Sequence, residues 1–211
     1  MPLQNRVRPD GEIVTSPARG MLMGNRGGKI HDHETRTLVR TQGSRQWITC
    51  VLKFKSRQRQ VMGHGYTELF FMDEVTALAA GHRPCFECRR GDALLFQSAW
   101  QSSQALAAPP KAPDMDRVLS GERRAKGGGK ITWSATASCL PDVAMVRFDG
   151  DILAVCGGKL LPWTASGYGT AVPVDLNIEV EVLTPPTIAR ILHAGYQPIW
   201  HQSVKRAGDK S

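Results

Sequence analysis

Two cysteines three positions apart, Cys85 and Cys88, impose a tight turn near the middle of the chain. Side chains at this spacing can reach one metal ion, and zinc takes four tetrahedral ligands that are mostly cysteine or histidine. Pro84 stiffens the turn, and a helix that follows it would direct amide dipoles at the thiolates. The alternatives are two thiols without a metal and a redox pair, although no βαβ pattern surrounds the cysteines. The spacing favours bound zinc.

The residues around this turn follow a distinctive order. An apolar aromatic strand leads into a capped helix that ends in Ala-Ala-Gly, followed by His-Arg-Pro-Cys, a second cysteine and basic residues. These features fall on Phe70, Phe71, Asp73, Ala79, Ala80, Gly81, His82, Arg83, Pro84, Cys85, Cys88 and Arg89. Residues 69–90 thereby resemble the second half of the metal-binding domain of the Ada DNA-repair proteins and related small zinc modules. The resemblance implies structural zinc on Cys85 and Cys88 and favours DNA as a partner.

The resemblance does not extend to the chemistry of the Ada family. The family pattern includes an upstream Cys-x3-Cys pair, and one thiol of that pair accepts a methyl group from a DNA phosphotriester. This chain has no such pair. Methyl transfer is therefore not carried over, and the remaining zinc ligands must come from elsewhere in the sequence.

The best candidates for these ligands are His31 and His33. Residues two apart in an extended segment point the same way, so both imidazoles can approach one ion. Asp32 or Glu34 would then orient the imidazoles through hydrogen bonds. The alternative is a solvated polar turn. Cys50 is another possible ligand, but its place on the apolar face of an alternating strand favours a small buried side chain.

No acidic residue lies between Glu34 and Glu68, whereas seven cationic residues do. Lys53 and Lys55 share one face of the expected strand with Trp47. A cationic β-ribbon that carries an aromatic side chain can lie along a phosphate backbone and stack on an exposed base. The residues expected to contact nucleic acid are Arg36, Arg40, Arg45, Trp47, Lys53, Lys55, Arg57, Arg59, Arg89 and Arg90.

The net charge of +8 is distributed unevenly. Residues 1–130 carry 21 of the 27 Lys and Arg but 12 of the 19 Asp and Glu, so residues 131–211 are close to neutral. A further basic cluster surrounds a triple-glycine loop and consists of Arg123, Arg124, Lys126 and Lys130. Such a surface favours a polyanion held through its backbone, because no known recognition helix is present. A solvated face that maintains solubility is the alternative.

Length and composition are those of a soluble globular protein. The 211 residues are 41% hydrophobic and 22% charged, which is sufficient for a domain with its own core. The first residues lack the apolar run of a secretory leader, and no segment approaches the roughly eighteen apolar residues that span a bilayer. Five cysteines without regular spacing argue against a disulfide framework. We expect a cytoplasmic protein without a membrane partner.

Hydrophobic periodicity predicts an α+β fold that is antiparallel and β-rich, with a few short helices and the Ada-like zinc turn. Three parts are expected. Residues 1–107 form a basic α+β zinc-binding part, 108–130 a linker with a basic helix, and 131–211 a β-rich part. One continuous domain is the alternative, because the β-rich part can pack onto the first part.

Local signals place several elements. Gln46–Lys55 alternates as a strand, and we expect it to turn into a second strand that ends near Met62. Asp73 is suited to cap a helix that Gly81 ends. Asp149-Gly150 is typical of the tight turn in a β-hairpin.

Three functions are compatible with these patterns. The first is a zinc-containing protein that binds nucleic acid, DNA in preference to RNA, in repair or DNA processing. The second is a metal-dependent nuclease, in which His31 is a general base or ligand and Asp32, Glu34 or Glu68 helps to hold Mg²⁺ or Mn²⁺ near the scissile phosphate. The third is a protein–protein adaptor with a structural zinc.

Overall fold

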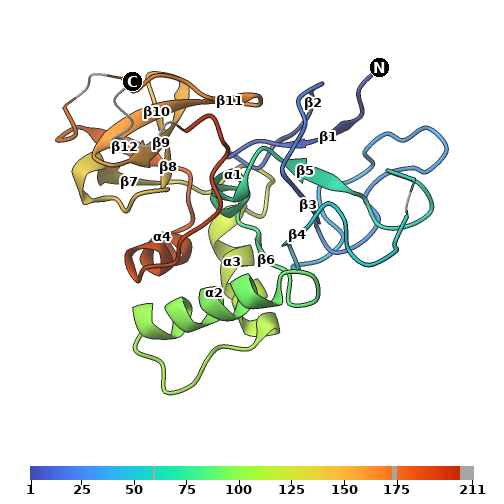
Figure 1. The fold of residues 1–211 in the computed structure, drawn as a ribbon, viewed down its shortest axis with the longest axis horizontal. Helices are drawn as coiled ribbons and strands as arrows, with labels where there is room; N and C mark the ends of the chain where they lie inside the picture. Colours follow the sequence, from blue (N-terminus) through green and yellow to red (C-terminus); the bar gives the residue numbers. More distant parts are fainter. Residues whose placement is uncertain (59, 173–174, 205–211) are drawn as a thin grey trace.

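The computed structural model describes residues 1–58, 60–172 and 175–204. Within these ranges the chain forms two six-stranded sheets and a few short helices (Figure 1), which confirms the α+β class. The first sheet is built from residues 4–84 and the second from residues 133–182. None of the described helices combines the length and apolar character that crossing a membrane requires.

The first sheet is mixed and has the strand order β2-β1-β5-β3-β4-β6. Its strands are β1 Gln4–Val7, β2 Ile13–Thr15, β3 Leu22–Asn25, β4 Ile48–Cys50, β5 Leu69–Phe71 and β6 Arg83–Pro84. Most neighbours are antiparallel, but β1 pairs with β5 and β4 pairs with β6 in parallel. The short β4–β6 pair matters for the site because cysteines stand at its end.

The second sheet is antiparallel throughout and has the order β11-β10-β9-β8-β12-β7. Its strands are β7 Trp133–Thr136, β8 Met145–Phe148, β9 Asp151–Cys156, β10 Lys159–Thr164, β11 Gly167–Tyr168 and β12 Glu179–Val182. Asp149 and Gly150 join β8 to β9 with φ angles of 50° and 85°. Both angles are left-handed, as the predicted two-residue hairpin turn requires.

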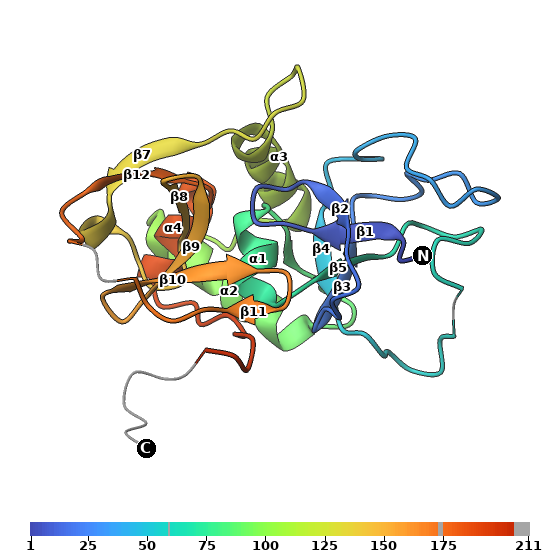
Figure 2. The same cartoon turned by 90° about the horizontal axis from the view of Figure 1, so that it is seen from above.

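Helix α1, Glu74–Ala79, lies between the two sheets (Figure 2) and contacts both β5 and β8. All six of its residues are buried. Asp73 caps it as predicted, because Asp73 Oδ1 accepts a hydrogen bond from the backbone N–H of Thr76 at 2.8 Å. Gly81 follows the helix with a φ of 86°, so the predicted end is confirmed as well.

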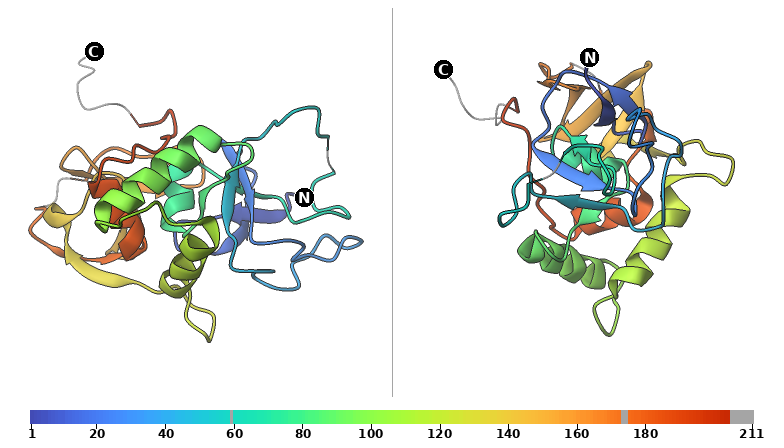
Figure 3. Two further views of the ribbon diagram at one scale, coloured as in Figure 1. Left: turned by 90° about the horizontal axis from the view of Figure 1, so that it is seen from below. Right: turned by 90° about the vertical axis from the view of Figure 1, so that its right-hand side faces the viewer.

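The remaining helices lie together on one side of the molecule (Figure 3). They are α2 Arg90–Ser103, α3 Ala112–Arg123 and α4 Pro186–His193, and a 3₁₀ turn, η1, covers Ala137–Cys139. Helix α3 falls inside the segment expected to hold a linker and a basic helix. Helices α2 and α3 both pack against α4, which comes from the far end of the chain.

The largest hydrophobic cluster crosses the expected part boundaries. It combines Val75 and Trp100 from the first part, Met115 from α3, and Met145 and Ile188 from the β-rich part. All five side chains are buried. Residues on both sides of 108–130 therefore share one core.

Strand β4 is shorter than its alternating pattern predicts, since it covers only Ile48–Cys50. The described residues from 51 to 68 contain no strand. Lys55 and Met62 have φ angles of 53° and 54°, which an extended chain cannot contain. Leu52 is 51% exposed and leaves the apolar face to which periodicity assigned it. The predicted β-ribbon over residues 46–62 is therefore wrong.

Candidate metal centre

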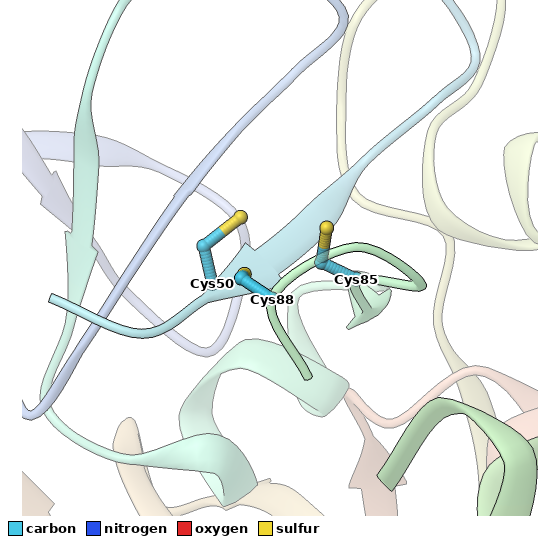
Figure 4. Close-up of side chains that lie close together, drawn as sticks. All are labelled: Cys50, Cys85 and Cys88. Carbon is cyan, nitrogen blue, oxygen red and sulfur yellow. The ribbon is translucent and has the colours of Figure 1, made fainter. Parts of the chain in front are cut away.

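Cys50, Cys85 and Cys88 converge at the end of the β4–β6 pair (Figure 4). The parallel register places Thr49 opposite Pro84, and a cysteine is the next residue on each strand. The backbone N–H of Cys85 extends this pairing by donating to the carbonyl of Thr49 at 2.9 Å. The three sulfur atoms all lie within 4.8 Å of one another. The group is thus compact enough to hold a metal ion.

The turn after β6 returns Cys88 to the same point. The backbone N–H of Arg89 donates to the carbonyl of Cys85 at 3.0 Å, and the N–H of Glu87 donates to Cys85 Sγ at 3.4 Å. Helix α2 begins directly afterwards at Arg90. The turn is therefore fixed at both ends, by the sheet and by a helix.

Hydrogen bonding among the three sulfur atoms shifts the pKa values of the thiols. The thiols of Cys50 and Cys88 donate to the sulfur of Cys85 and so lower the pKa of Cys85. Hydrogen bonds with Cys85 and Cys88, followed by burial, raise the pKa of Cys50. Contact with Cys50 lowers the pKa of Cys88, but contact with Cys85 and burial outweigh it and raise that pKa. Holding all three as thiolates requires a cation among them.

A cavity of about 350 Å³ opens beside the three cysteines. Asn25, Tyr66 and Glu68 line it together with apolar side chains. Glu68 is buried, and its Oε2 accepts a hydrogen bond from the backbone N–H of Met62 at 2.8 Å. The cavity leaves room beside the sulfur atoms for a fourth ligand that is not a cysteine.

The structure does not bring His31 and His33 to the cysteines, since neither belongs to the metal-binding group found among the described residues. His31 is buried, and its two ring nitrogens already have partners. Nδ1 lies 2.5 Å from Thr67 Oγ1, and Nε2 lies 2.8 Å from the carbonyl oxygen of Gly63. The His33 ring packs instead against His64, with ring centroids 4.5 Å apart.

Asp32 and Glu34 form part of a polar turn and not of a metal site. Asp32 Oδ1 accepts hydrogen bonds from the backbone N–H groups of Glu34 and Thr35, at 3.0 and 2.8 Å. The bonds from Thr35 lower the pKa of Asp32. The described residues show no cluster of potential metal ligands at this turn. The geometry here is that of the solvated turn, the alternative to histidine ligation.

Trp47 is buried, with 1% of its surface exposed. The guanidinium carbons of Arg26 and Arg123 lie 3.8 and 3.9 Å from its ring centroid. His82 packs against the same ring at 4.8 Å. The expectation that Trp47 faces solvent beside Lys53 and Lys55 is therefore wrong. The Trp47 ring lies in the interior between two guanidinium groups.

Arg89 is also buried, in contrast to the expected contact with nucleic acid. Its guanidinium donates to Thr49 Oγ1 at 2.9 Å, to Glu74 Oε2 at 2.7 Å and to Asp92 Oδ2 at 2.9 Å. These bonds connect the cysteine turn to β4, α1 and α2. Arg89 is a structural residue of the centre, and it cannot reach a phosphate from this position.

Several other cations of the expected set are at the surface. The exposed members are Arg40, Arg45, Lys53, Lys55, Arg57 and Arg90. Arg57 pairs with Glu87 at 2.6 Å. Within the described ranges, neither Lys53 nor Lys55 has a carboxylate within 4.0 Å. Arg36 is half-buried, and Arg59 lies outside the described residues.

Sequence periodicity undervalues Cys50 and gives no sign that Arg26 and Arg123 are buried. Alternation correctly places Cys50 among buried side chains. A stronger signal is a single cysteine at a strand end, upstream of a Cys-x2-Cys turn that lacks its other ligands. The burial of Arg26 and Arg123 has no local sequence signal. Arg26 has no acidic residue near it in the chain, and Glu122, which precedes Arg123, pairs with Arg190 instead.

Comparison with known proteins identified no matching family model, no similar curated protein and no similar solved structure.

Proposed function

We propose that Cys50, Cys85 and Cys88 bind one zinc ion, and that this zinc stabilises a protein that binds nucleic acid, DNA in preference to RNA. The observation that carries the proposal is the convergence of the three sulfur atoms within 4.8 Å. A tetrahedral zinc site, with Zn–S distances of about 2.3 Å, separates its sulfur atoms by about 3.8 Å. Small side-chain rotations would therefore close the three cysteines around the ion.

The donor set fits zinc. Thiolates are soft ligands that select zinc over magnesium or calcium. The 350 Å³ cavity adjoins the three cysteines and has room for a water molecule that would complete the coordination, whereas Glu68 does not belong to the group of ligand atoms within 4.8 Å of one another. The zinc would add a further connection between β4 and the turn before α2, beside the parallel β4–β6 pair and the hydrogen bond from Arg89 to Thr49. Its role is structural, because binding energy at such a site is folding energy.

Exposed cations near the centre support the nucleic-acid part of the proposal. Lys53, Lys55 and Arg57 follow Cys50 along the chain, and Arg90 follows Cys88. Exposed Lys and Arg contact phosphates without reading bases, and the binding energy comes largely from released counterions. The resemblance of residues 69–90 to Ada-type zinc modules favours DNA.

Metal content tests the zinc centre. Purified, reduced protein should contain about one equivalent of zinc by inductively coupled plasma mass spectrometry. Cys50→Ser and Cys85→Ser should each lose most of it, and should unfold at a lower temperature than the parent protein. Cys139→Ser is the matched control, because Cys139 is an exposed cysteine outside the group. Folded, reduced protein that contains no zinc, or full zinc content in the Cys50 variant, would contradict the proposed centre.

Salt-dependent binding tests the partner. The affinity for a fluorescein-labelled DNA oligonucleotide, measured by anisotropy, should fall as salt rises. The double variant Lys53→Gln/Lys55→Gln should reduce the slope of log K against log salt by about two, because each phosphate contact contributes about one. Lys111→Gln/Lys159→Gln removes the same charge elsewhere and should leave the slope unchanged. Equal slopes for both variants would exclude the exposed cations that follow Cys50 (Lys53, Lys55 and Arg57, the Lys53 surface) as the binding site.

A further inference from the structure

A groove of about 890 Å³ lies away from the cysteines, between the β1–β2 hairpin, residues 38–41 and residues 124–132. Its cationic lining residues are Arg26, Arg40, Arg124, Lys130 and Arg147. Its acidic side chains are Asp10, Glu12 and Glu181. The groove adjoins the triple-glycine loop, which carries a basic cluster that the zinc centre does not use.

The acidic side chains do not balance these cations. Asp10 pairs with Arg8 at 3.0 Å and with Arg147 at 3.5 Å. Glu181 pairs with Arg147 at 2.8 Å. In the part of the chain that the structure describes, no carboxylate lies within 4.0 Å of any of the other four cations, Arg26, Arg40, Arg124 and Lys130. Four cations of the groove therefore have no ion pair, and the acidic groups that oppose them are Glu12 and Asp10, which acts on Lys130 electrostatically.

Part of this positive charge is buried. Arg26 is fully buried, and its Nη2 donates to the carbonyl of Gly11 at 2.7 Å. Lys130 Nζ donates to the carbonyl of Ala79 at 2.6 Å. Burial lowers the pKa of both groups, and that of Lys130 falls to about 7. Arg26 is thus a buried cation whose hydrogen-bond partners are all neutral, which is costly, and an anion placed near it offsets that cost.

The cluster behind the groove is short of hydrogen-bond acceptors. Arg123 stacks on Trp47 together with Arg26 and donates to the carbonyl of Arg45 at 2.6 Å. Among the residues described, the N–H groups at Arg123 Nε and Trp47 Nε1 are buried without an acceptor. The interior therefore adds positive potential beneath the groove and does not neutralise it.

A second groove continues the first. It has a volume of about 720 Å³ and shares Thr41 and Arg124 with the first groove. Its cationic lining adds Arg45, Arg117 and Lys126, and no acidic side chain lines it. The glycine loop between the grooves has an open backbone, since no protein atom lies within 4 Å of a Cβ placed on Gly127 or Gly129. The two grooves form one cationic track that is longer than a single phosphate requires.

We propose that this track, which we name the Arg124 track (Arg40, Arg45, Arg124, Lys126 and Lys130), binds successive phosphates of a polynucleotide backbone, with the guanidinium of Arg26 buried beneath it. The inference rests on the proposed function for its ligand, but its residues are separate from the zinc centre and from the Lys53 surface. Arg124 stands where the two grooves meet and would contact the central phosphate. At Gly127 and Gly129 the loop leaves room for neighbouring phosphate oxygens to approach its backbone, whereas the N–H of Gly128 already donates to the carbonyl of Ala125.

The test compares two double variants of the full-length protein. Arg124→Gln/Lys126→Gln should reduce the salt slope for the labelled DNA oligonucleotide by about two, because it removes two phosphate contacts. Lys111→Gln/Lys159→Gln should leave the slope unchanged. Circular dichroism and thermal melting verify that each variant is folded. Arg40→Gln, which changes an exposed residue on the other wall of the track, provides a second variant with an expected reduction of about one.

An unchanged slope for the Arg124 and Arg40 variants, beside a reduced slope for Lys53→Gln/Lys55→Gln, would overturn the Arg124 track and leave the proposed function standing. Parent protein that binds no oligonucleotide would contradict the proposed function itself, and the inference with it. Titration with inorganic pyrophosphate separates a small phosphate ligand from a polymer. Pyrophosphate binding as tight as that of the oligonucleotide would overturn the assignment to a polynucleotide backbone.

Discussion

Buried arginines divide into two kinds in this protein. Arg83 and Arg89 lie against carboxylates, at 2.8 Å from Asp116 and 2.7 Å from Glu74. Arg26 and Arg123 lie instead on Trp47 and against backbone carbonyls. The first kind connects segments of the fold, because each ion pair joins residues far apart in the chain. The second kind concentrates positive charge beneath the groove that Arg124 lines.

Replacement of Arg89 should be strongly destabilising. Arg89→Met leaves the buried carboxylate of Glu74 without its cation, and the loss of one partner of a buried ion pair costs about 3–5 kcal/mol. Urea denaturation followed by circular dichroism measures this change in the free energy of unfolding. The neighbouring exposed Arg90 is the control, and Arg90→Gln should change the free energy by no more than about 0.5 kcal/mol. Equal effects for the two variants would contradict the structural role of Arg89.

Helix α1 contacts both sheets, through β5 and β8. Six residues are too few to form a stable helix in isolation. Asp73 stabilises this short helix through the hydrogen bonds that its carboxylate accepts. Its Oδ1 accepts from the backbone N–H and hydroxyl of Thr76, while its Oδ2 accepts from the Tyr168 hydroxyl at 2.9 Å and the His201 N–H at 3.1 Å. One carboxylate thus joins α1 to β11 and to the C-terminal segment.

Removal of this carboxylate should destabilise the fold by about 3 kcal/mol or more, because a lost N-cap costs about 1 kcal/mol and each buried donor without a partner about 1–3 kcal/mol. Thermal and urea denaturation of Asp73→Ala would measure the effect. Tyr168→Phe removes a single hydrogen bond to the same carboxylate and should cost about 1 kcal/mol. A cost for Asp73→Ala no larger than that for Tyr168→Phe would refute the central role of Asp73.

At the scale of the whole molecule, the two sheets enclose α1, and one core extends through residues 72–196. The uneven charge has a structural counterpart. The Arg124 track lies where the basic first part of the chain meets the second sheet, with Arg147 and Glu181 from that sheet at its border. The second sheet therefore borders the track with an ion pair, and the cationic side chains of the track itself all come from residues 1–130.

A chain that ends at residue 130 should not fold. It would lack Met145, Ile188 and Ile191, so Val75 and Leu78 of α1 would lose the side chains that cover them. Dispersion of amide signals in an NMR spectrum of this fragment would decide the question, and a native-like spectrum would show that the first part is an independent domain. The full chain should unfold in a single transition, with coincident circular dichroism and tryptophan fluorescence.

The sequence alone determined the features that depend on close neighbours. The N-cap at Asp73, the helix end at Gly81 and the turn at Asp149-Gly150 involve hydrogen bonds and φ angles within a few residues. The Cys85–Cys88 spacing likewise places two sulfur atoms together in one turn. These predictions agree with the structure because the decisive interactions are local.

Only the tertiary structure decided which residues join that turn and which charges reach solvent. Cys50 arrives beside Cys85 through the parallel register of β4 and β6, whereas His31 is occupied by Thr67 and the Gly63 carbonyl. Trp47 and Arg89 resemble surface residues in the sequence, but the fold brings cations to one and carboxylates to the other. Each of these outcomes depends on contacts between segments that are distant in the chain. The free energy of such contacts cannot be read from a local sequence pattern.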